Sequence, residues 1–263
     1  MSTTSILSTP PIFSLGAAHL RSWNLALRRA LKAVPNLSGA ILELGCGNGR
    51  FIRTIGKTRP GLVRHGLDIS PLRIRWAQRE DPQGNYLLGS ATHLPYASDA
   101  IDVVLLMDVL EHLPNPRQGL KEARRVLRPD GTLHALVPCE GQPGTLHWLL
   151  GKLGLGADLK RRHEGHVQRF THGQIVALCT QTDLHIFDIS YSMHPLGQIR
   201  DLLSYVQREP GAPGWLFASP FYRLLDTSLW LLAYGESVLF GRLPFLAVAM
   251  HITARKPVAE SPL

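Results

Sequence analysis

The stretch Ile41-Leu42-Glu43-Leu44-Gly45-Cys46-Gly47-Asn48-Gly49-Arg50 decides the fold of this chain. Its apolar start predicts a buried strand, its glycines predict a tight turn, and the residues that follow predict a helix. Glycines at alternate positions let the backbone take positive φ and approach a ligand closely. The helix then presents unpaired N–H groups and a positive dipole end to an anion. The stretch therefore predicts a site for a nucleotide-like cofactor.

The glycine spacing narrows the kind of cofactor. A dinucleotide-binding loop has the pattern G-x-G-x-x-G, and its third glycine would fall where Arg50 stands. The pattern here is G-x-G-x-G, and an acid, Glu43, lies two residues before the first glycine. Residues 62–70 predict a second strand that ends in Asp68, where a βαβ unit places a carboxylate for the ribose hydroxyls. The alternative is that Asp68 caps the next helix, although Ser70 is better suited to that task.

Three further segments extend the pattern. They are Gly89-Ser90-Ala91-Thr92-His93-Leu94-Pro95-Tyr96, the run from Ile101 that ends in Leu110-Glu111-His112-Leu113, and Arg125-Val126-Leu127-Arg128-Pro129-Asp130-Gly131. Together with the glycine loop, they resemble the motifs of class I S-adenosylmethionine-dependent methyltransferases. The likeness is strongest to the type 11 branch, which methylates small molecules and quinones. It covers residues 40–138 and says little about the rest of the chain.

The resemblance implies an α/β fold: a Rossmann-like, seven-stranded methyltransferase sheet with helices on both faces and a substrate-capping insertion. It also implies S-adenosylmethionine as the cofactor. Carried over position by position, it implies that the cofactor contacts are Glu43, Gly45, Cys46, Gly47, Asp68, Ile69, Ser90, Ala91 and Met107. Ser90 departs from the family, which usually has an aspartate that accepts from the adenine amino group. A serine hydroxyl can also accept, but it is shorter and uncharged.

The chain pattern indicates a single domain over residues 17–263, after a flexible N-terminal arm at residues 1–16. We expect a cofactor half at 17–138 that starts with an amphipathic helix, a lid at 139–170, and an apolar helical insertion at about 196–244. The seven strands are expected near residues 40–45, 62–68, 85–89, 101–107, 131–138, 184–190 and about 245–255.

The chemistry implied by this cofactor needs little from the protein. Methyl transfer from a sulfonium is an in-line displacement, so the protein aligns the acceptor, excludes water and removes a proton where the acceptor atom is oxygen. His112, just after the fourth expected strand, is the candidate catalytic base or substrate ligand. The alternative is that Glu111 and His112 only begin the next turn. His134, inside the fifth expected strand, is interpreted as a core histidine.

The expected lid contains a basic segment, Lys160-Arg161-Arg162-His163-Glu164-Gly165-His166-Val167-Gln168-Arg169-Phe170-Thr171. Its end resembles the H-x-x-x-F-T segment that folds over the active-site mouth in the same branch. His163, His166 and Arg169 are therefore candidate substrate contacts. A zincin-type pair needs histidines four residues apart, and Val167 stands at that position, so no metal is expected. The segment either attracts an anionic group of the acceptor or is an ordinary solvated charge run.

Residues 196–244 are unusually apolar for a surface insertion. They include Trp215-Leu216-Phe217, Leu229-Trp230-Leu231-Leu232 and Val238-Leu239-Phe240, but no uninterrupted apolar run reaches the roughly 18–20 residues that span a bilayer. One interpretation is a helix in the plane of a membrane surface, or a hydrophobic lid over the substrate. The other is that this face packs against the sheet edge or a second subunit. The oligomeric state stays open.

Composition supports these hypotheses without choosing the acceptor. Three cysteines, none in a C-x-x-C pair, fit a reducing compartment, so we expect a cytoplasmic protein, with the inner face of a membrane as a peripheral location. The net charge of +8 raises RNA as a substrate, but no RNA-binding module is appended and no nucleic-acid partner is favoured. The preferred function is methylation of a small, hydrophobic or lipid-like acceptor at oxygen or carbon. The alternatives are an RNA methyltransferase and a non-catalytic methyltransferase-fold protein that binds at a membrane surface.

Overall fold

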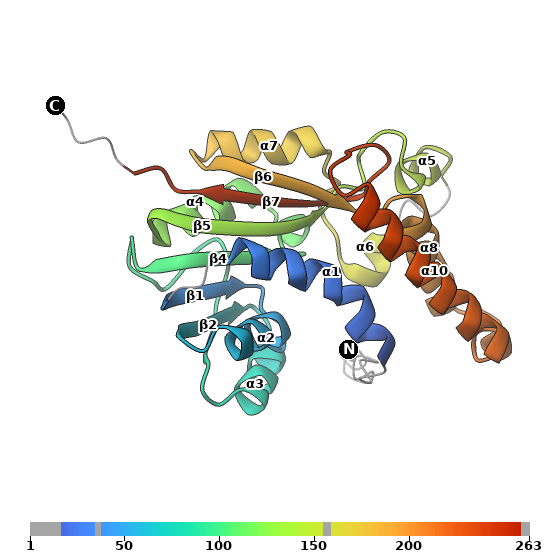
Figure 1. The fold of residues 1–263 in the computed structure, drawn as a ribbon, viewed down its shortest axis with the longest axis horizontal. Helices are drawn as coiled ribbons and strands as arrows, with labels where there is room; N and C mark the ends of the chain where they lie inside the picture. Colours follow the sequence, from blue (N-terminus) through green and yellow to red (C-terminus); the bar gives the residue numbers. More distant parts are fainter. Residues whose placement is uncertain (1–16, 35–37, 155–158, 259–263) are drawn as a thin grey trace, which may run out of the picture.

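The computed structural model describes residues 17–34, 38–154 and 159–258. In this part of the chain, seven strands form one sheet in the order β3-β2-β1-β4-β5-β7-β6 (Figure 1). The strands are β1 (Gly39–Leu44), β2 (Leu62–Asp68), β3 (Asn85–Leu88), β4 (Ile101–Met107), β5 (Leu127–Pro138), β6 (His185–Ser192) and β7 (Ala249–Arg255). Strands β1 to β5 pair in parallel, and β7 runs antiparallel between β5 and β6. The predicted seven-stranded Rossmann-like sheet is confirmed. The arm predicted at residues 1–16 lies outside the described residues.

Helices cover both faces of this sheet. Towards the N-terminus they are α1 (Ala17–Ala33), α2 (Arg50–Thr58), α3 (Pro71–Glu80), the 3-10 turn η1 (Leu110–His112) and α4 (Pro116–Val126). Further along the chain they are α5 (Leu146–Lys152), α6 (Leu159–Glu164), α7 (His172–Gln181), α8 (Pro195–Arg208), α9 (Gly214–Phe217) and α10 (Pro220–Leu239). Helices α1, α2 and α3 pack on one face, and α4 and α7 pack on the other.

The alternation of strand residues explains the two buried layers. Val103, Leu105 and Met107 of β4 pack with the cluster beneath α1, α2 and α3, whereas Val104 and Leu106 pack with the cluster beneath α4 and α7. Successive side chains of a strand point to opposite faces, so a strand covered on both faces must be apolar throughout. In β4 this burial is reflected in the uninterrupted apolar residues 103–107, which follow the less buried Asp102.

The parallel arrangement brings five chain segments to one edge of the sheet. Leu44, Asp68, Leu88, Met107 and Pro138 each end a parallel strand, so the loops that follow them meet at the carboxyl edge. In open α/β sheets this is the edge at which ligands bind. The predicted cofactor residues and His112 all belong to these loops or strand ends.

The structure differs from the sequence prediction at the last strand. β7 begins at Ala249 rather than near residue 245. Leu246 takes a positive φ of 55°, and the backbone N–H of Ala247 donates to the carbonyl of Pro244, so the chain turns before it enters the sheet. The apolar composition of residues 245–248 did not indicate this turn, because a strand and a buried turn can have the same composition.

The apolar insertion forms three helices that extend away from the sheet (Figure 1). Helix α10 packs along α8, and α10 also contacts α1. Two side-chain bonds join α8 to α10: the Arg200 guanidinium donates to Asp226, and Glu236 accepts from the backbone N–H of Leu196. Among the described helices, none is long and apolar enough to cross a membrane.

Candidate active site

The glycine loop between β1 and α2 leaves one open position. Gly45, Gly47 and Gly49 all have positive φ, at 64°, 56° and 73°. A Cβ at Gly45 would lie 2.7 Å from the Val109 side chain, and one at Gly49 would lie 2.6 Å from the Tyr86 hydroxyl. At Gly47 the nearest heavy atom would be 4.0 Å away, at the tip of Arg73. The outer glycines therefore let protein pack closely, whereas Gly47 exposes its backbone to a space that a ligand can fill.

Asp68 joins the glycine loop to the end of β2. One carboxylate oxygen accepts from the backbone N–H of Gly47 at 2.8 Å, and the other accepts from Ser70 at 2.8 Å. Each oxygen has a second lone pair, so the carboxylate can still accept from a pair of hydroxyls. The cap of α3 is Ser70, whose hydroxyl accepts from the backbone N–H of Arg73 at 3.4 Å. Ser70, and not Asp68, therefore caps this helix.

Glu43 lies beneath the loop. Its side chain is 2% exposed and accepts from the backbone N–H of Ile52 at 3.0 Å, in the first turn of α2. Burial raises the pKa of this carboxyl to about 8, although the bond from Ile52 acts in the opposite direction. Glu43 thus fixes the helix to the strand, and its direct contact with a cofactor stays a prediction.

The other predicted cofactor residues lie along the same edge with different exposure. Cys46, Ala91 and Met107 are buried, whereas Ile69 is 77% exposed. The Ser90 hydroxyl lies 2.8 Å from the Thr92 hydroxyl and accepts from the Thr92 backbone N–H at 3.2 Å. Ser90 is therefore engaged within its own turn, which leaves it less capacity for an adenine amino group than an aspartate would have.

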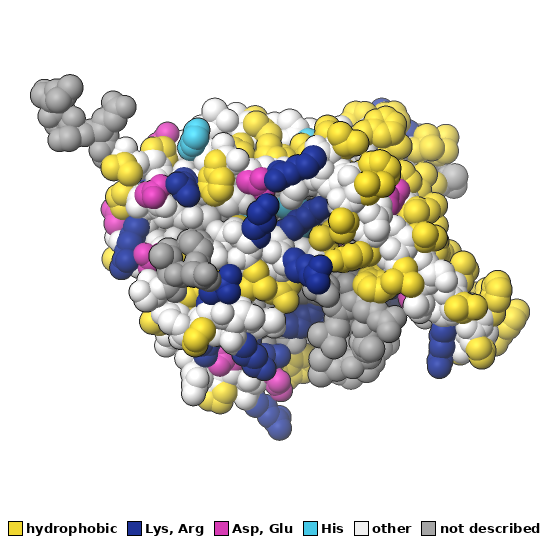
Figure 2. Space-filling model, viewed as in Figure 1, with side chains coloured by type: hydrophobic (Ala, Val, Ile, Leu, Met, Phe, Trp, Pro, Cys, Tyr) yellow, Lys and Arg dark blue, Asp and Glu magenta, His cyan; other side chains and the backbone are white. Residues whose placement is uncertain are grey.

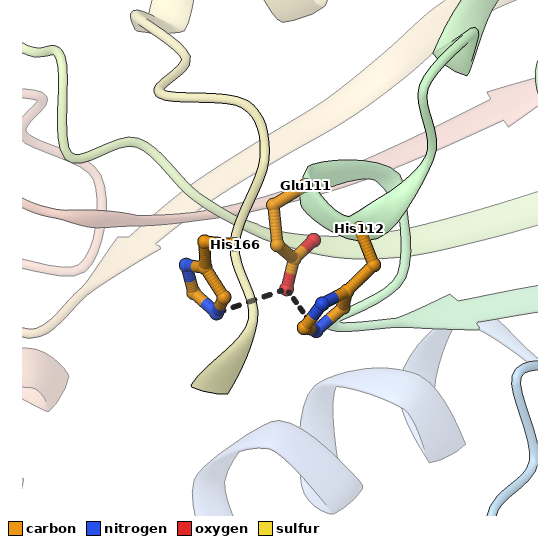
Figure 3. A group of neighbouring side chains, drawn as sticks. All are labelled: Glu111, His112 and His166. Atoms are coloured by element: carbon orange, nitrogen blue, oxygen red, sulfur yellow. Dashed lines mark ion pairs between the residues drawn. The ribbon is translucent and has the colours of Figure 1, made fainter. Parts of the chain in front are cut away.

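A second group of side chains lies beside the loop. Val109, which touches Gly45, leads into η1, and η1 carries Glu111 and His112. The carbonyl of Glu111 accepts from the backbone N–H groups of Val167 and Gln168, at 2.9 and 3.0 Å, so the lid segment is bound to η1. This bond brings His166 beside His112, with perpendicular rings whose centroids are 4.9 Å apart (Figure 3).

The pKa values of Asp108, Glu111 and His112 are all shifted from their usual ranges. Burial and the nearby Asp108 raise the pKa of Glu111 well above its usual range. Asp108 keeps access to solvent, but the surrounding protein raises its pKa to about 6 against the opposing effect of Lys160 and His166. Burial, and then the neighbouring His166, lower the pKa of His112, so its imidazole is neutral at pH 7. Asp108 also has a positive φ of 55°, an uncommon conformation that often marks functional sites.

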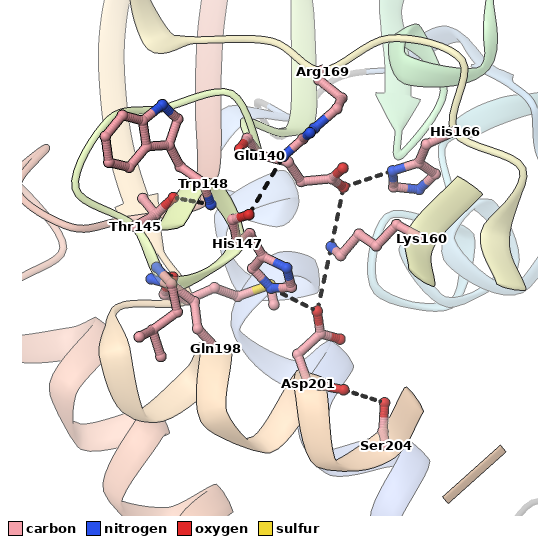
Figure 4. Close-up of polar contacts among 12 residues, drawn as sticks. Glu140, Thr145, His147, Trp148, Lys160, His166, Arg169, Gln198, Asp201 and Ser204 are labelled. Atoms are coloured by element: carbon pink, nitrogen blue, oxygen red, sulfur yellow. Dashed lines mark hydrogen bonds and ion pairs between the residues drawn. The ribbon is translucent and has the colours of Figure 1, made fainter. Parts of the chain in front are cut away.

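Charged side chains, most of them buried, hold the segment that the sequence predicts as a lid (Figure 4). The Lys160 ammonium lies 3.3 Å from Glu140, just after β5, and 3.3 Å from Asp201 on α8. Glu140 also bonds His166 at 2.7 Å, and His147 of α5 lies 3.2 Å from Asp201. Burial alone would lower the pKa of Lys160, but Asp201 and Glu140 outweigh it and raise this pKa.

Of the three predicted lid contacts, the structure brings only His166 to this group. His163 bonds Glu209 at 2.7 Å and stacks on Tyr205. Arg169 donates to the carbonyls of Glu140 and His147. His134 is a core histidine, as expected, beside the Thr253 hydroxyl at 3.0 Å. Sequence reasoning missed Glu140, although its position directly after β5 at the carboxyl edge was the available signal.

Surface hollows are also found away from this group of residues. Two shallow ones, lined among others by Asp183 and Lys256, flank the edge where the parallel strands begin. Because α/β sheets bind ligands at the opposite edge, these hollows carry no cofactor argument.

Comparison with known proteins identifies the part of the chain that builds this edge. Residues 42–135 match a family described as "Methyltransferase domain". A methyltransferase from Mycobacterium sp. strain KMS is 32% identical over 139 residues, which are 51% of this chain and 54% of that protein. Residues 42–135 form a class I methyltransferase domain.

Two more proteins, one curated relative and one solved structure, are similar to this chain. The phthiotriol/phenolphthiotriol dimycocerosates methyltransferase of Mycobacterium leprae is 34% identical over 101 residues, 37% of each chain. A chain in the complex of the Haloferax volcanii Trm112 methyltransferase activator with a methyltransferase has a TM-score of 0.61 at 20% identity, covering 91% of this chain and 92% of that one. The chain spans between one third and about half of the length of the curated relatives that it matches.

The cofactor of this methyltransferase class is S-adenosylmethionine, which carries the transferable methyl group on a cationic sulfur. The residues at the edge fit it. The open backbone at Gly47 offers a surface for close approach, and Asp68 keeps free lone pairs for the ribose hydroxyls. The buried Glu43 supports the loop from below.

We predict that Asp68→Ala weakens S-adenosylmethionine binding by about 1.5–3 kcal/mol, the range for a hydrogen bond to a charged group. Titration calorimetry measures this change, and Glu80→Gln, a surface acid on α3, is the control and should bind as the wild type does. Because Asp68 also holds Gly47, a 2′-deoxyribose analogue is needed to separate the two roles. If the wild type loses no affinity for that analogue, Asp68 acts on the loop alone.

A second prediction concerns the buried lysine. Lys160→Ala leaves the buried Glu140 and the partly buried Asp201 without their shared cation, so it should lower the free energy of unfolding by about 3–5 kcal/mol. Urea denaturation measures the change. The neighbouring Arg161→Ala is the matched control because Arg161 is exposed, and it should change stability by less than about 0.5 kcal/mol. Equal effects of the two variants would contradict the assignment of this network.

Proposed function

We propose that this chain transfers a methyl group from S-adenosylmethionine to a small, hydrophobic or lipid-like acceptor, at oxygen or carbon. The observation that carries the proposal is the meeting of two groups at one edge of the sheet. The open Gly47 backbone and Asp68 provide the cofactor side, while Glu111, His112 and His166 provide a polar side beneath the lid. Val109 joins the two groups because it touches Gly45 and leads into η1.

The residues of this chain would act mainly by position. His112 is 39% exposed at its side chain, and its Nδ1 lies 3.3 Å from the carbonyl of Gly165. That carbonyl can only accept, so Nδ1 is the donor and Nε2 keeps a lone pair. A neutral imidazole with a free lone pair can take the proton of an acceptor hydroxyl as the methyl group is transferred. The lid segment bound to Glu111 would limit the access of water.

The apolar acceptor is supported by the surface of the insertion. Trp215, Phe221 and Leu239 are 77%, 71% and 76% exposed, and Leu224 and Leu232 add to the same helical unit. Figure 2 shows apolar side chains along the projecting part of the molecule. Exposed apolar surface of this extent marks a contact site. The M. leprae relative is named for dimycocerosates, which are lipid-like.

We infer that this surface meets a lipid bilayer that holds the acceptor. Tryptophan and phenylalanine at the tip of a helical unit suit the interface between headgroups and acyl chains. The net charge of +8 favours anionic lipids. Helix α8 connects this surface to the lid, because Asp201 of α8 contacts Lys160 of α6.

Turnover tests the reaction. With labelled S-adenosylmethionine, we expect label in a lipid or quinone fraction rather than in RNA. His112→Ala should lower kcat by about 100-fold or more if the acceptor is a hydroxyl. His163→Ala, in the same lid but bonded to Glu209, should leave kcat unchanged. Label found only in RNA, or in no fraction at all, would contradict the proposal.

Vesicle co-sedimentation tests the membrane contact. The double variant Trp215→Ser/Phe221→Ser should bind anionic vesicles at least about tenfold more weakly, since each buried aromatic side chain contributes about 1.5–3 kcal/mol. The matched control is Phe187→Ser, an exposed phenylalanine on β6. The surface would instead contact a second copy of the chain if the wild type does not bind vesicles and forms a dimer, while the double variant is a monomer.

A further inference from the structure

Three potential metal ligands converge where the lid meets η1. One carboxylate oxygen of Glu111, one ring nitrogen of His112 and one of His166 lie within 4.8 Å of one another (Figure 3). The Nε2 atom of His112 is 3.8 Å from the Glu111 oxygen, and the Nε2 atom of His166 is 4.0 Å from it. These separations are too long for hydrogen bonds, so the three groups face one another without bonding directly.

The other nitrogen of each ring is already engaged. His166 Nδ1 lies 2.7 Å from Glu140, and His112 Nδ1 lies 3.3 Å from the carbonyl of Gly165. Both partners accept hydrogen bonds, so both Nδ1 atoms are donors and both Nε2 atoms present lone pairs. A carboxylate or backbone carbonyl behind each imidazole is the arrangement that fixes the tautomer and direction of metal-binding histidines.

Glu111 supplies the second, independent observation. Its side chain is 0% exposed, and neither carboxylate oxygen has a hydrogen-bond partner among the described residues. A buried polar group without a partner is costly. The nearby cation Lys160 is held between Glu140 and Asp201, at 3.3 Å from each. The arrangement therefore presents a carboxyl group and two nitrogen lone pairs around a common space.

We propose that Glu111, His112 and His166 bind one divalent transition-metal ion of the Zn²⁺ type. Two imidazoles and one carboxylate form a ligand set used for catalytic zinc, in which a further position stays open. Bonds of about 2.0–2.2 Å place tetrahedral ligand atoms roughly 3.4 Å apart. The two histidines must therefore approach Glu111 by about half an ångström, and the widest pair of the group must close by up to about 1.4 Å. His112 is 39% exposed and has room to move.

The proposed site differs from the sequence prediction that no metal binds. That prediction compared His163 with His166, which are neighbours in sequence, whereas the structure pairs His166 with Glu111 and His112. If the proposed function holds, a bound ion would take the Nε2 lone pair of His112 and would instead lower the pKa of a bound acceptor hydroxyl. Metal binding itself does not depend on methyl transfer.

The test is a titration of chelator-treated protein with Zn²⁺ and, as a coloured probe, Co²⁺. We expect one ion per chain by calorimetry, visible Co²⁺ absorption, and a higher melting temperature when the ion is bound. His112→Ala and His166→Ala should each weaken binding at least 100-fold. His93→Ala, which removes an exposed histidine outside the group, should leave it unchanged.

Circular dichroism of each variant separates loss of the ligand from loss of the fold, and His112→Ala is the decisive variant because its side chain is only half-buried. Stoichiometric binding that His112→Ala and His166→Ala abolish supports the site. No binding by the wild type, or equal binding by a folded His112→Ala, overturns it. The titration contains neither S-adenosylmethionine nor acceptor, so failure of the metal site and failure of the methyltransferase proposal are measured separately.

Discussion

The parallel pairing of β1 to β5 is the constraint on which the rest of this structure depends. Strands that run in the same direction end at the same edge, so the residues after each strand meet there however far apart they lie in the sequence. Parallel pairing also requires helical crossovers, and these bury both faces of the sheet. The glycine loop, Asp68, η1 and Glu140 are neighbours for this reason alone.

The two sides of this edge are held by different forces. The cofactor side is organised by short-range hydrogen bonds: Asp68 to Gly47, and Glu43 to the first turn of α2. The lid side is organised by buried charge, with Lys160 between Glu140 and Asp201. Buried ion pairs contribute little net stability but penalise every arrangement that separates the partners. These ion pairs therefore determine the position of the segment more than they add to the stability of the fold.

The acidic side chains near the predicted lid differ in whether a cation lies beside them. Glu140 and Asp201 share Lys160, and their pKa values are lowered although burial alone would raise them. Glu111 has no such partner within the described residues, and burial keeps its pKa high. The difference follows from geometry, because Lys160 on α6 reaches towards α8 and the end of β5 rather than towards η1. The acidic group without a cation partner among the described residues is thus the one beside the two histidines.

The sequence by itself determined the sheet, the glycine loop, Asp68 and the place of His112, because these depend on local patterns: strand periodicity, glycine spacing and the order of motifs. It could not determine which lid side chains reach the edge. His163 and His166 are three residues apart, yet one pairs with Glu209 and the other enters the group around Glu111. It also missed the turn before β7 and the buried position of Lys160. Those outcomes rest on contacts between residues distant in sequence, and only tertiary packing decides which side chains share a buried space.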